Sequence, residues 1–166
     1  MKWPDWTGRR TPPGDALYRR IVELARSPSW FQAGGVPDTV DGRFDAVALV
    51  LALVMLRLER EDAARFSVDV TERFIADMDG SLRQMGIGDP TVGKQVGHMV
   101  GALGGRLGAY REALAGQAPL AEALARNLYR GAAVDPVALA WSEGEVRRLV
   151  AKFDALPEAA IREGRL

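Results

Sequence analysis

The chain has no cysteine and one histidine, His98, among its 166 residues. The lack of cysteine excludes disulfides, thiolate metal sites and cysteine nucleophiles, and it is typical of a reducing compartment. A single histidine also excludes a multi-histidine metal site. We find no constellation of side chains typical of an enzyme and therefore expect a non-catalytic protein without a metal or cofactor.

An excess of charge and a long hydrophobic run are also missing. Lys and Arg together number 22, as do Asp and Glu, so the formal net charge is zero and no nucleic-acid recognition is expected. The longest apolar run, over 46–56, is about half of a membrane span, which predicts a buried helix. Residues 1–13 lack the pattern of a secretory signal or transit peptide, which favours a cytoplasmic protein.

Apolar residues recur at helical spacing along almost the whole chain, and no segment alternates as a strand does. This pattern predicts an all-α protein with a single compact multi-helix domain over 14–156. We expect a flexible N-terminal segment over 1–13 and a short, ragged C-terminal tail over 157–166. The sixteen residues 27–42 predict a long loop between the first two helices, and loops of that length are often functional.

Capping signals divide the chain into helices. Asp15 and Asp89 are predicted N-caps, Gly86 is a predicted C-cap, and Ser142 with Glu145 resembles a capping box. The predicted helices cover 16–26, 43–60, 64–85, 90–114, 120–129 and 143–153. The helix over 43–60 is apolar on all sides and is expected to be the central one, while methionines 78, 85 and 99 fall at core positions.

Glycine is abundant where a helix should avoid it, because each interior glycine costs about 1 kcal/mol relative to alanine. Six glycines share one 120° stripe of the predicted helix over 90–114, beside a core ridge and opposite a polar side that holds Gln95 and Arg106. They are Gly93, Gly97, Gly101, Gly104, Gly105 and Gly108. A bare stripe admits a second helix very closely, and that helix belongs either to the chain itself or to a partner.

Three aspartates, Asp38, Asp41 and Asp45, cluster in the run "DTVDGRFD". They lack the spacing of a calcium loop, so we interpret them as turn and capping residues, with one carboxylate paired to Arg43. His98 lies at the boundary of the glycine stripe. A haem-handling role for His98 with a methionine remains a minor alternative that one absorbance spectrum would test.

Two long segments, "LYRRIVELARSPSWFQAGGVPDTVDGRFD" and "DMDGSLRQMGIGDPTVGKQVGHMVGALGGRLGAY", together resemble the ubiquinol-cytochrome c chaperone family. The resemblance covers about residues 17–130 and rests on the order and spacing of the residues that match the family pattern. The matching residues are Tyr18, Ala25-Arg26, Pro37-Asp38, Asp41-Gly42-Arg43-Phe44-Asp45, Asp79, Leu82-Arg83, Met85-Gly86, Gly88-Asp89, Gly105-Arg106 and Tyr110.

The resemblance implies an all-helical assembly factor that binds newly made cytochrome b and aids biogenesis of respiratory complex III. Mitochondrial relatives act at the ribosome with a small partner subunit. The missing transit peptide suggests a bacterial member that works at the cytoplasmic face of the inner membrane. The structural motif carried over consists of Asp41, Gly42, Arg43, Gly86 and Asp89.

A soluble protein that holds an apolar helix of a membrane client needs a bare or apolar groove. We therefore expect the client to bind on the glycine stripe, beside Val100 and under two aromatic residues of the long loop. The expected binding residues are Gly97, Gly101, Gly104, Gly108, Val100, Trp30 and Phe31. The alternative is a helical homo-oligomerising adaptor in which the stripe is a seam between copies and no client is held.

Overall fold

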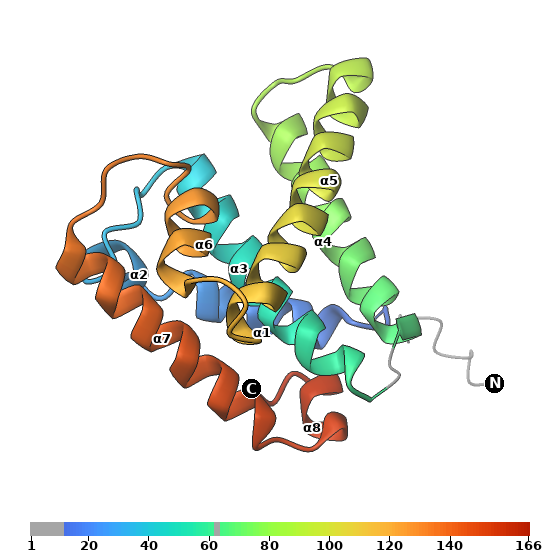
Figure 1. Ribbon diagram of the computed structural model, residues 1–166. Coiled ribbons are helices and arrows are strands. Elements are labelled where there is room, and N and C mark those ends of the chain that lie inside the picture. Colours follow the sequence, from blue (N-terminus) through green and yellow to red (C-terminus); the bar gives the residue numbers. More distant parts are fainter. Residues whose placement is uncertain (1–11, 62–63) are drawn as a thin grey trace.

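A computed structural model describes residues 12–61 and 64–166. Within these ranges the chain is helical and contains no strand, so the all-α prediction is confirmed (Figure 1). The helices are α1 (Asp15–Ala25), α2 (Pro28–Gln32), α3 (Val40–Glu59), α4 (Ala64–Gln84), α5 (Asp89–Leu114), α6 (Leu120–Asn127), α7 (Pro136–Asp154) and α8 (Glu158–Arg162). Most of the predicted N-terminal segment 1–13 lies outside the described residues.

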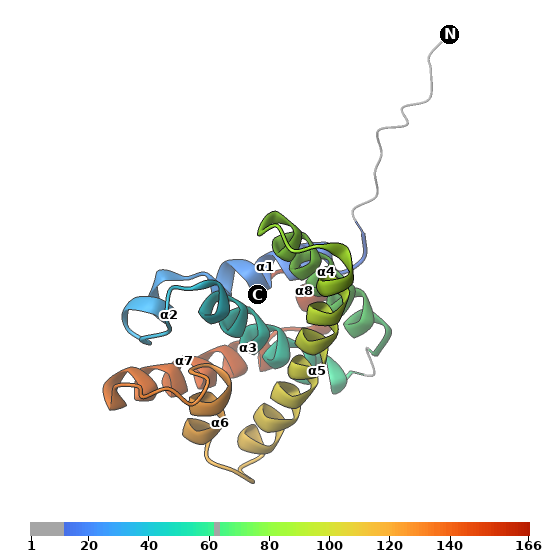
Figure 2. The same ribbon diagram turned by 90° about the horizontal axis from the view of Figure 1, so that it is seen from above.

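Helix α3 is the centre of the molecule, as its sequence predicted. Every residue from Phe44 to Val54 is buried, and α1, α4, α5 and α7 pack around it (Figure 2). The helix begins three residues earlier than expected, at Val40, because the hydroxyl of Thr39 accepts a hydrogen bond from the Gly42 amide at 3.1 Å. Thr39 is therefore the N-cap, and Asp41 lies in the first turn.

Helices α4 and α5 form a hairpin whose turn projects away from the rest of the molecule (Figure 1). Gly86 is confirmed as the residue that ends α4: it has φ of 79°, and its amide donates to the Arg83 carbonyl while the Ile87 amide donates to that of Leu82. This is a Schellman motif, which needs a left-handed residue and favours glycine.

The predicted N-cap role of Asp89 is wrong. Gly88 occupies the N-cap position in an extended conformation, and Asp89 already lies inside the first turn of α5. Its carboxylate pairs instead with Arg83, which also bonds Asp79 at 2.7 Å. Asp89 therefore ties the two helices of the hairpin together rather than satisfying the free amides of α5.

The predicted capping box at Ser142 is also wrong. Helix α7 starts seven residues earlier than predicted, and the carboxylate of its N-cap, Asp135, accepts hydrogen bonds from two backbone amides of the first turn. Ser142 is buried within α7, and its hydroxyl shares a hydrogen bond with Tyr129 at 2.7 Å. The side chain that looked like a cap is thus a buried polar contact between α7 and the residues after α6.

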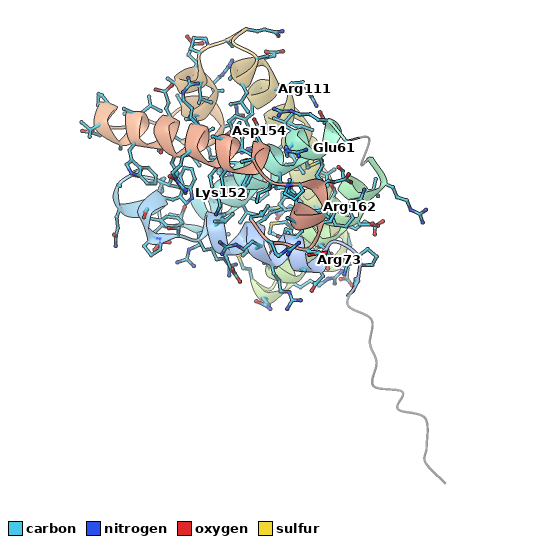
Figure 3. The ribbon with its side chains drawn as sticks, turned by 90° about the horizontal axis from the view of Figure 1, so that it is seen from below. Glu61, Arg73, Arg111, Lys152, Asp154 and Arg162 are labelled. Atoms are coloured by element: carbon cyan, nitrogen blue, oxygen red, sulfur yellow. The ribbon has the colours of Figure 1, made fainter. Side chains whose placement is uncertain are left out.

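Residues 157–166, expected as a ragged tail, contain α8, and both Ile161 and Leu166 are buried against the core. The end of α7 is held by Arg57 of α3, whose guanidinium donates to the carbonyls of Phe153 and Leu156 at 3.2 and 3.0 Å. Arg57 also pairs with Glu61, which is labelled together with Asp154 in Figure 3. A cation at the C-terminal carbonyls complements the helix dipole.

Candidate binding surfaces

The run 41–45 builds a buried charged cluster at the start of α3. Asp45 is 1% exposed, and its two carboxylate oxygens accept hydrogen bonds from Arg106 of α5 and Arg130 after α6, each at 2.5 Å. Arg106 also lies over the ring of Phe44 at 5.4 Å. Burial raises the pKa of Asp45, and the two guanidinium groups oppose that shift. The cluster joins three parts of the chain that are distant in sequence.

Arg106 was expected on the polar side of its helix, but it is buried in this cluster. The remaining charges of the predicted motif lie at the surface and are paired: Arg43 donates to Asp38 at 2.7 Å, and Arg130 pairs with Asp41 at 2.9 Å. The hydrogen bond from Arg43 lowers the pKa of Asp38. The expected pairing of one carboxylate with Arg43 is confirmed at Asp38, whereas the interpretation of Asp45 as a turn or capping residue is wrong, because its carboxylate is buried in the cluster.

Gly42 is required by a close approach of the backbone. A side-chain carbon added there would overlap the carbonyl oxygen of Pro37, which belongs to the connection that leads into α3. Across 12–61 and 64–166, no group of three or more His, Cys, Asp or Glu side chains gathers where it could hold a metal ion. Two residues of the motif carried over from the family resemblance thus lie at helix ends: Gly42 admits the connection into α3, and Gly86 follows the end of α4.

The expected place of Trp30 is wrong. Residues 28–32 form the short helix α2 instead of a loop, because Pro28 begins a new helical turn, and this turn points Trp30 inward. Trp30 is 1% exposed, its indole donates to the Leu24 carbonyl at 3.1 Å, and its ring packs edge-on against Trp141 of α7. A side-chain carbon added at any of the stripe glycines would meet nothing within 4 Å, so Trp30 does not cover them, and α3 lies between α2 and α5 in Figure 2.

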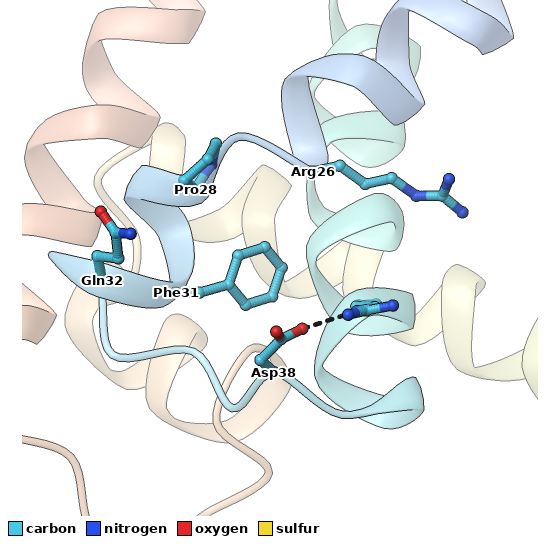
Figure 4. A pocket seen from close by; sticks show the side chains of 6 residues that line it. Arg26, Pro28, Phe31, Gln32 and Asp38 are labelled. Carbon is cyan, nitrogen blue, oxygen red and sulfur yellow. Dashed lines mark hydrogen bonds and ion pairs between the residues drawn. The ribbon is translucent and has the colours of Figure 1, made fainter.

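Phe31 is half-buried and lies on a different surface from the glycines. It lines a hollow of about 500 Å³ together with Arg26, Pro28, Gln32, Asp38 and Arg43. In Figure 4 the ring of Phe31 points toward Asp38, whose ion pair is drawn dashed. The structure therefore separates both aromatic residues of the expected site from the glycine stripe.

The glycine stripe of α5, which we call the glycine face, is open. It consists of Gly93, Gly97, Gly101, Gly104, Gly105 and Gly108. All except the half-buried Gly108 are exposed, and a side-chain carbon added at any of them would meet nothing within 4 Å. Val100 lies half-buried at one edge and His98 is exposed at the other. No helix of the described chain packs on this face, so the interpretation as internal packing is wrong for these residues.

A second surface was missed from the sequence. An apolar groove of about 340 Å³ runs between α3, α4 and α5, and we call it the methionine groove. Its apolar lining includes Val40, Phe44, Met78, Leu82, Met85 and Met99. Met85 was expected in the core, but it follows the last residue of α4 and is 50% exposed. Because the three methionines come from different turns of a hairpin, only the packing of α4 on α5 brings them together.

The described helices do not include one that is both long enough and apolar enough to cross a membrane. An all-helical fold with an open backbone face and an apolar groove defines a class of helical proteins suited to holding another polypeptide. The sequence profile of the ubiquinol-cytochrome C chaperone family matches residues 32–166. The chain therefore belongs to the ubiquinol-cytochrome C chaperone family.

A solved structure agrees with this assignment. The crystal structure of the Cbp3 homolog from Brucella abortus matches the fold with a TM-score of 0.78 at 28% sequence identity, over 91% of this chain and 85% of that one. The sequence has no match among curated proteins. The resemblance stated from the sequence is thus confirmed at the level of family and fold.

Proposed function

We propose that this protein is a non-catalytic chaperone that binds newly made cytochrome b and aids biogenesis of the ubiquinol-cytochrome c reductase complex. Membership of the chaperone family supports the class of function, and the matched residues 32–166 include the glycine face and, apart from Arg26, the lining of the methionine groove. The proposed place of action is the cytoplasmic face of the inner membrane. Contact with the ribosome or a small partner subunit belongs to the same proposal.

The glycine face is the observation that carries the proposal. Each of its six glycines costs about 1 kcal/mol of helix stability relative to alanine, and no packing within the described chain uses the space that they leave. Stability given up without an internal gain is typical of a functional site. We infer that a partner from outside the chain occupies the face.

The chemistry of the face fits an apolar helix. Small residues at i, i+4 and i+7 or i+8 let two helix backbones approach, so that van der Waals contact and weak Cα–H hydrogen bonds replace side-chain interlocking. Gly97, Gly101, Gly104 and Gly108 have this spacing, with Val100 beside them. A membrane protein such as cytochrome b supplies helices whose apolar surface must be covered before insertion.

Capture of the client by glycine-to-leucine variants tests this proposal. The tagged wild type, a Gly101→Leu/Gly108→Leu double variant and a Gly144→Leu control are used to recover partners from membranes and ribosomes of the native host. Gly144 is an exposed glycine of α7 whose added side chain also meets nothing within 4 Å, so it matches the helix cost without touching the face. Circular dichroism establishes that all three proteins are folded.

We expect wild type and the control to recover cytochrome b and the double variant to lose it. Equal recovery by all three folded proteins would move the client site away from the glycine face. Absence of cytochrome b from every sample would contradict the client assignment itself. If the wild type is an oligomer by light scattering and the double variant a monomer, the face is a seam between copies and the adaptor alternative holds.

A further inference from the structure

Helix α5 does not turn its most apolar side toward the core. Eight large apolar side chains form its ridge, but only Val92, Leu103 and Tyr110 among them are buried. Four others lie along the edge of the ridge that adjoins the glycine face, and all four are half-buried. We call them the apolar strip: Val96, Val100, Leu107 and Leu114. The helix thus leaves four large apolar side chains partly in water.

The side of α5 that is buried instead includes Arg106 and Ala113. At 100° per residue, the mean direction of the five buried residues differs by about 40° from that of the eight apolar ones. Burial of apolar area alone favours an orientation in which the apolar ridge faces inward. The helix is therefore turned about its own axis, away from the apolar strip.

The buried charged cluster accounts for this orientation. The Arg106 guanidinium donates to the Asp45 carboxylate of α3 at 2.5 Å and to the Asn127 carbonyl of α6 at 3.4 Å. Asp45 is 1% exposed and is also held by Arg130. Because a buried charge that loses its partner is strongly destabilising, α5 cannot turn Arg106 outward while Asp45 is in place.

The orientation of α5 decides how much apolar surface the molecule presents. Turning the ridge inward would carry Arg106 toward the surface and the apolar strip toward the core. At 100° per residue, Val100 and Leu107 lie within about 60° of Gly104, so the strip and the glycine face form one continuous surface. The ion pair between Asp45 and Arg106 thus keeps apolar side chains available beside the bare backbone.

We propose that Asp45 and Arg106 are positioning residues, which hold α5 in the orientation that keeps the apolar strip half-exposed beside the glycine face. The occupant is the apolar helix of the client, so this inference rests on the proposed function and extends its surface. The glycine face offers close backbone contact, whereas the strip adds large apolar side chains that exclude water along one edge of the bound helix. The buried ion pair therefore serves binding as well as folding.

Cysteine labelling measures the orientation of α5 directly, because the chain has no cysteine of its own. Leu107→Cys and Ala109→Cys place a thiol on either flank of the buried side, and both positions are half-buried. In the otherwise wild-type chain, their rates of reaction with a maleimide should agree within about threefold. Asp45→Val removes the partner of Arg106 and lets α5 turn, so the thiol at 107 should react more slowly and the thiol at 109 faster. We expect the ratio of the two rates to change about tenfold.

A purely structural role would change the two rates together, because destabilisation exposes both flanks of α5. Trp30→Ala is the matched control, since Trp30 is also 1% exposed and packs against Trp141 of α7. It should raise both rates and leave their ratio unchanged. Asp45→Asn keeps the shape of the side chain and should shift the ratio in the same direction as Asp45→Val. It decides the question if Asp45→Val does not fold.

Capture of the client tests the apolar strip separately. Leu107→Gln places a polar group on the strip, and Ala109→Gln places the same group on the opposite flank. We expect Leu107→Gln to lower the recovery of cytochrome b about fivefold through lost apolar contact, and Ala109→Gln to recover as much as wild type. Circular dichroism establishes that both proteins are folded.

Three results would overturn parts of this inference. A ratio of labelling rates that is unchanged in both Asp45 variants would contradict the positioning role. Equal recovery of cytochrome b by Leu107→Gln and Ala109→Gln would remove the strip from the client surface. If wild type recovers no cytochrome b, the proposed function and the role of the strip fail together, while labelling still decides whether Asp45 and Arg106 set the orientation of α5.

Discussion

Replacing Gly97, Gly101 and Gly104 by alanine should stabilise this protein. None of the three has a positive φ, and a side-chain carbon added at any of them meets nothing within 4 Å, so alanine brings no clash. Each change removes the helix cost of glycine, about 0.5 to 1 kcal/mol. The triple variant should therefore gain about 1.5 to 3 kcal/mol in the free energy of unfolding, or roughly 3 to 12 °C in Tm for a domain of this size.

The matched opposite is Gly42→Ala. The added carbon would overlap the Pro37 carbonyl oxygen, which belongs to the backbone and cannot rotate away. We expect a loss of about 2 kcal/mol or more, since the start of α3 must shift to make room. Glycine-to-alanine substitution thus raises the free energy of unfolding on the glycine face and lowers it at Gly42. This difference separates the effect of packing from that of helix preference.

Urea unfolding followed by circular dichroism measures the free energy of unfolding of both variants, and calorimetry measures their Tm. A triple variant no more stable than wild type would refute the reasoning, because it would mean that the glycines already make a favourable contact or that α5 is not helical there. Because alanine is still small, the triple variant should keep client capture while the leucine variant loses it. Alanine on the glycine face should therefore change stability alone, whereas leucine on the same face should remove client binding.

Three further predictions rest on buried side chains. Tyr110→Phe should be neutral or stabilise by about 1 kcal/mol, because the Tyr110 hydroxyl is buried without a hydrogen-bond partner. Tyr129→Phe should instead cost about 1 to 3 kcal/mol, because it removes the hydrogen bond to the Gly34 carbonyl. Urea unfolding measures both changes in the free energy of unfolding. Asp45→Asn should cost about 3 to 5 kcal/mol, since it leaves a buried guanidinium unpaired; a cost below 1 kcal/mol would show that the cluster is not buried in solution. Trp30→Ala should cost about 3 to 5 kcal/mol in thermal unfolding, and a stability equal to wild type would restore a surface role for this side chain.

Features set by neighbouring residues could be predicted from the sequence. The uninterrupted apolar run predicted that α3 is central, and the glycine that follows α4 predicted the left-handed turn at Gly86. Caps were less predictable, because several residues near each helix start can accept a hydrogen bond and only the backbone conformation selects one. In the structure the N-cap of α3 is therefore Thr39 rather than Asp41, and the N-cap of α7 is Asp135 rather than Ser142.

The candidate surfaces depended on contacts between distant residues. The glycine stripe was visible on a helical wheel, but whether another helix covers it depends on the whole packing. The bond from Arg106 to Asp45 spans 61 residues, and helical spacing alone placed Arg106 on the polar side. Trp30 was assigned to a loop because a helix of five residues shows no periodicity.

The projecting hairpin of α4 and α5 has a consequence for local unfolding. Between Val92 and Leu103 no residue of α5 is buried, whereas four residues from Leu103 onward are. Amide hydrogens in the outer half of this helix should therefore exchange through local opening at much lower free energy than those near Tyr110, whose exchange needs the core to open. The glycine face spans both halves, so a helix bound there would extend slow exchange outward, toward the turn at Gly86.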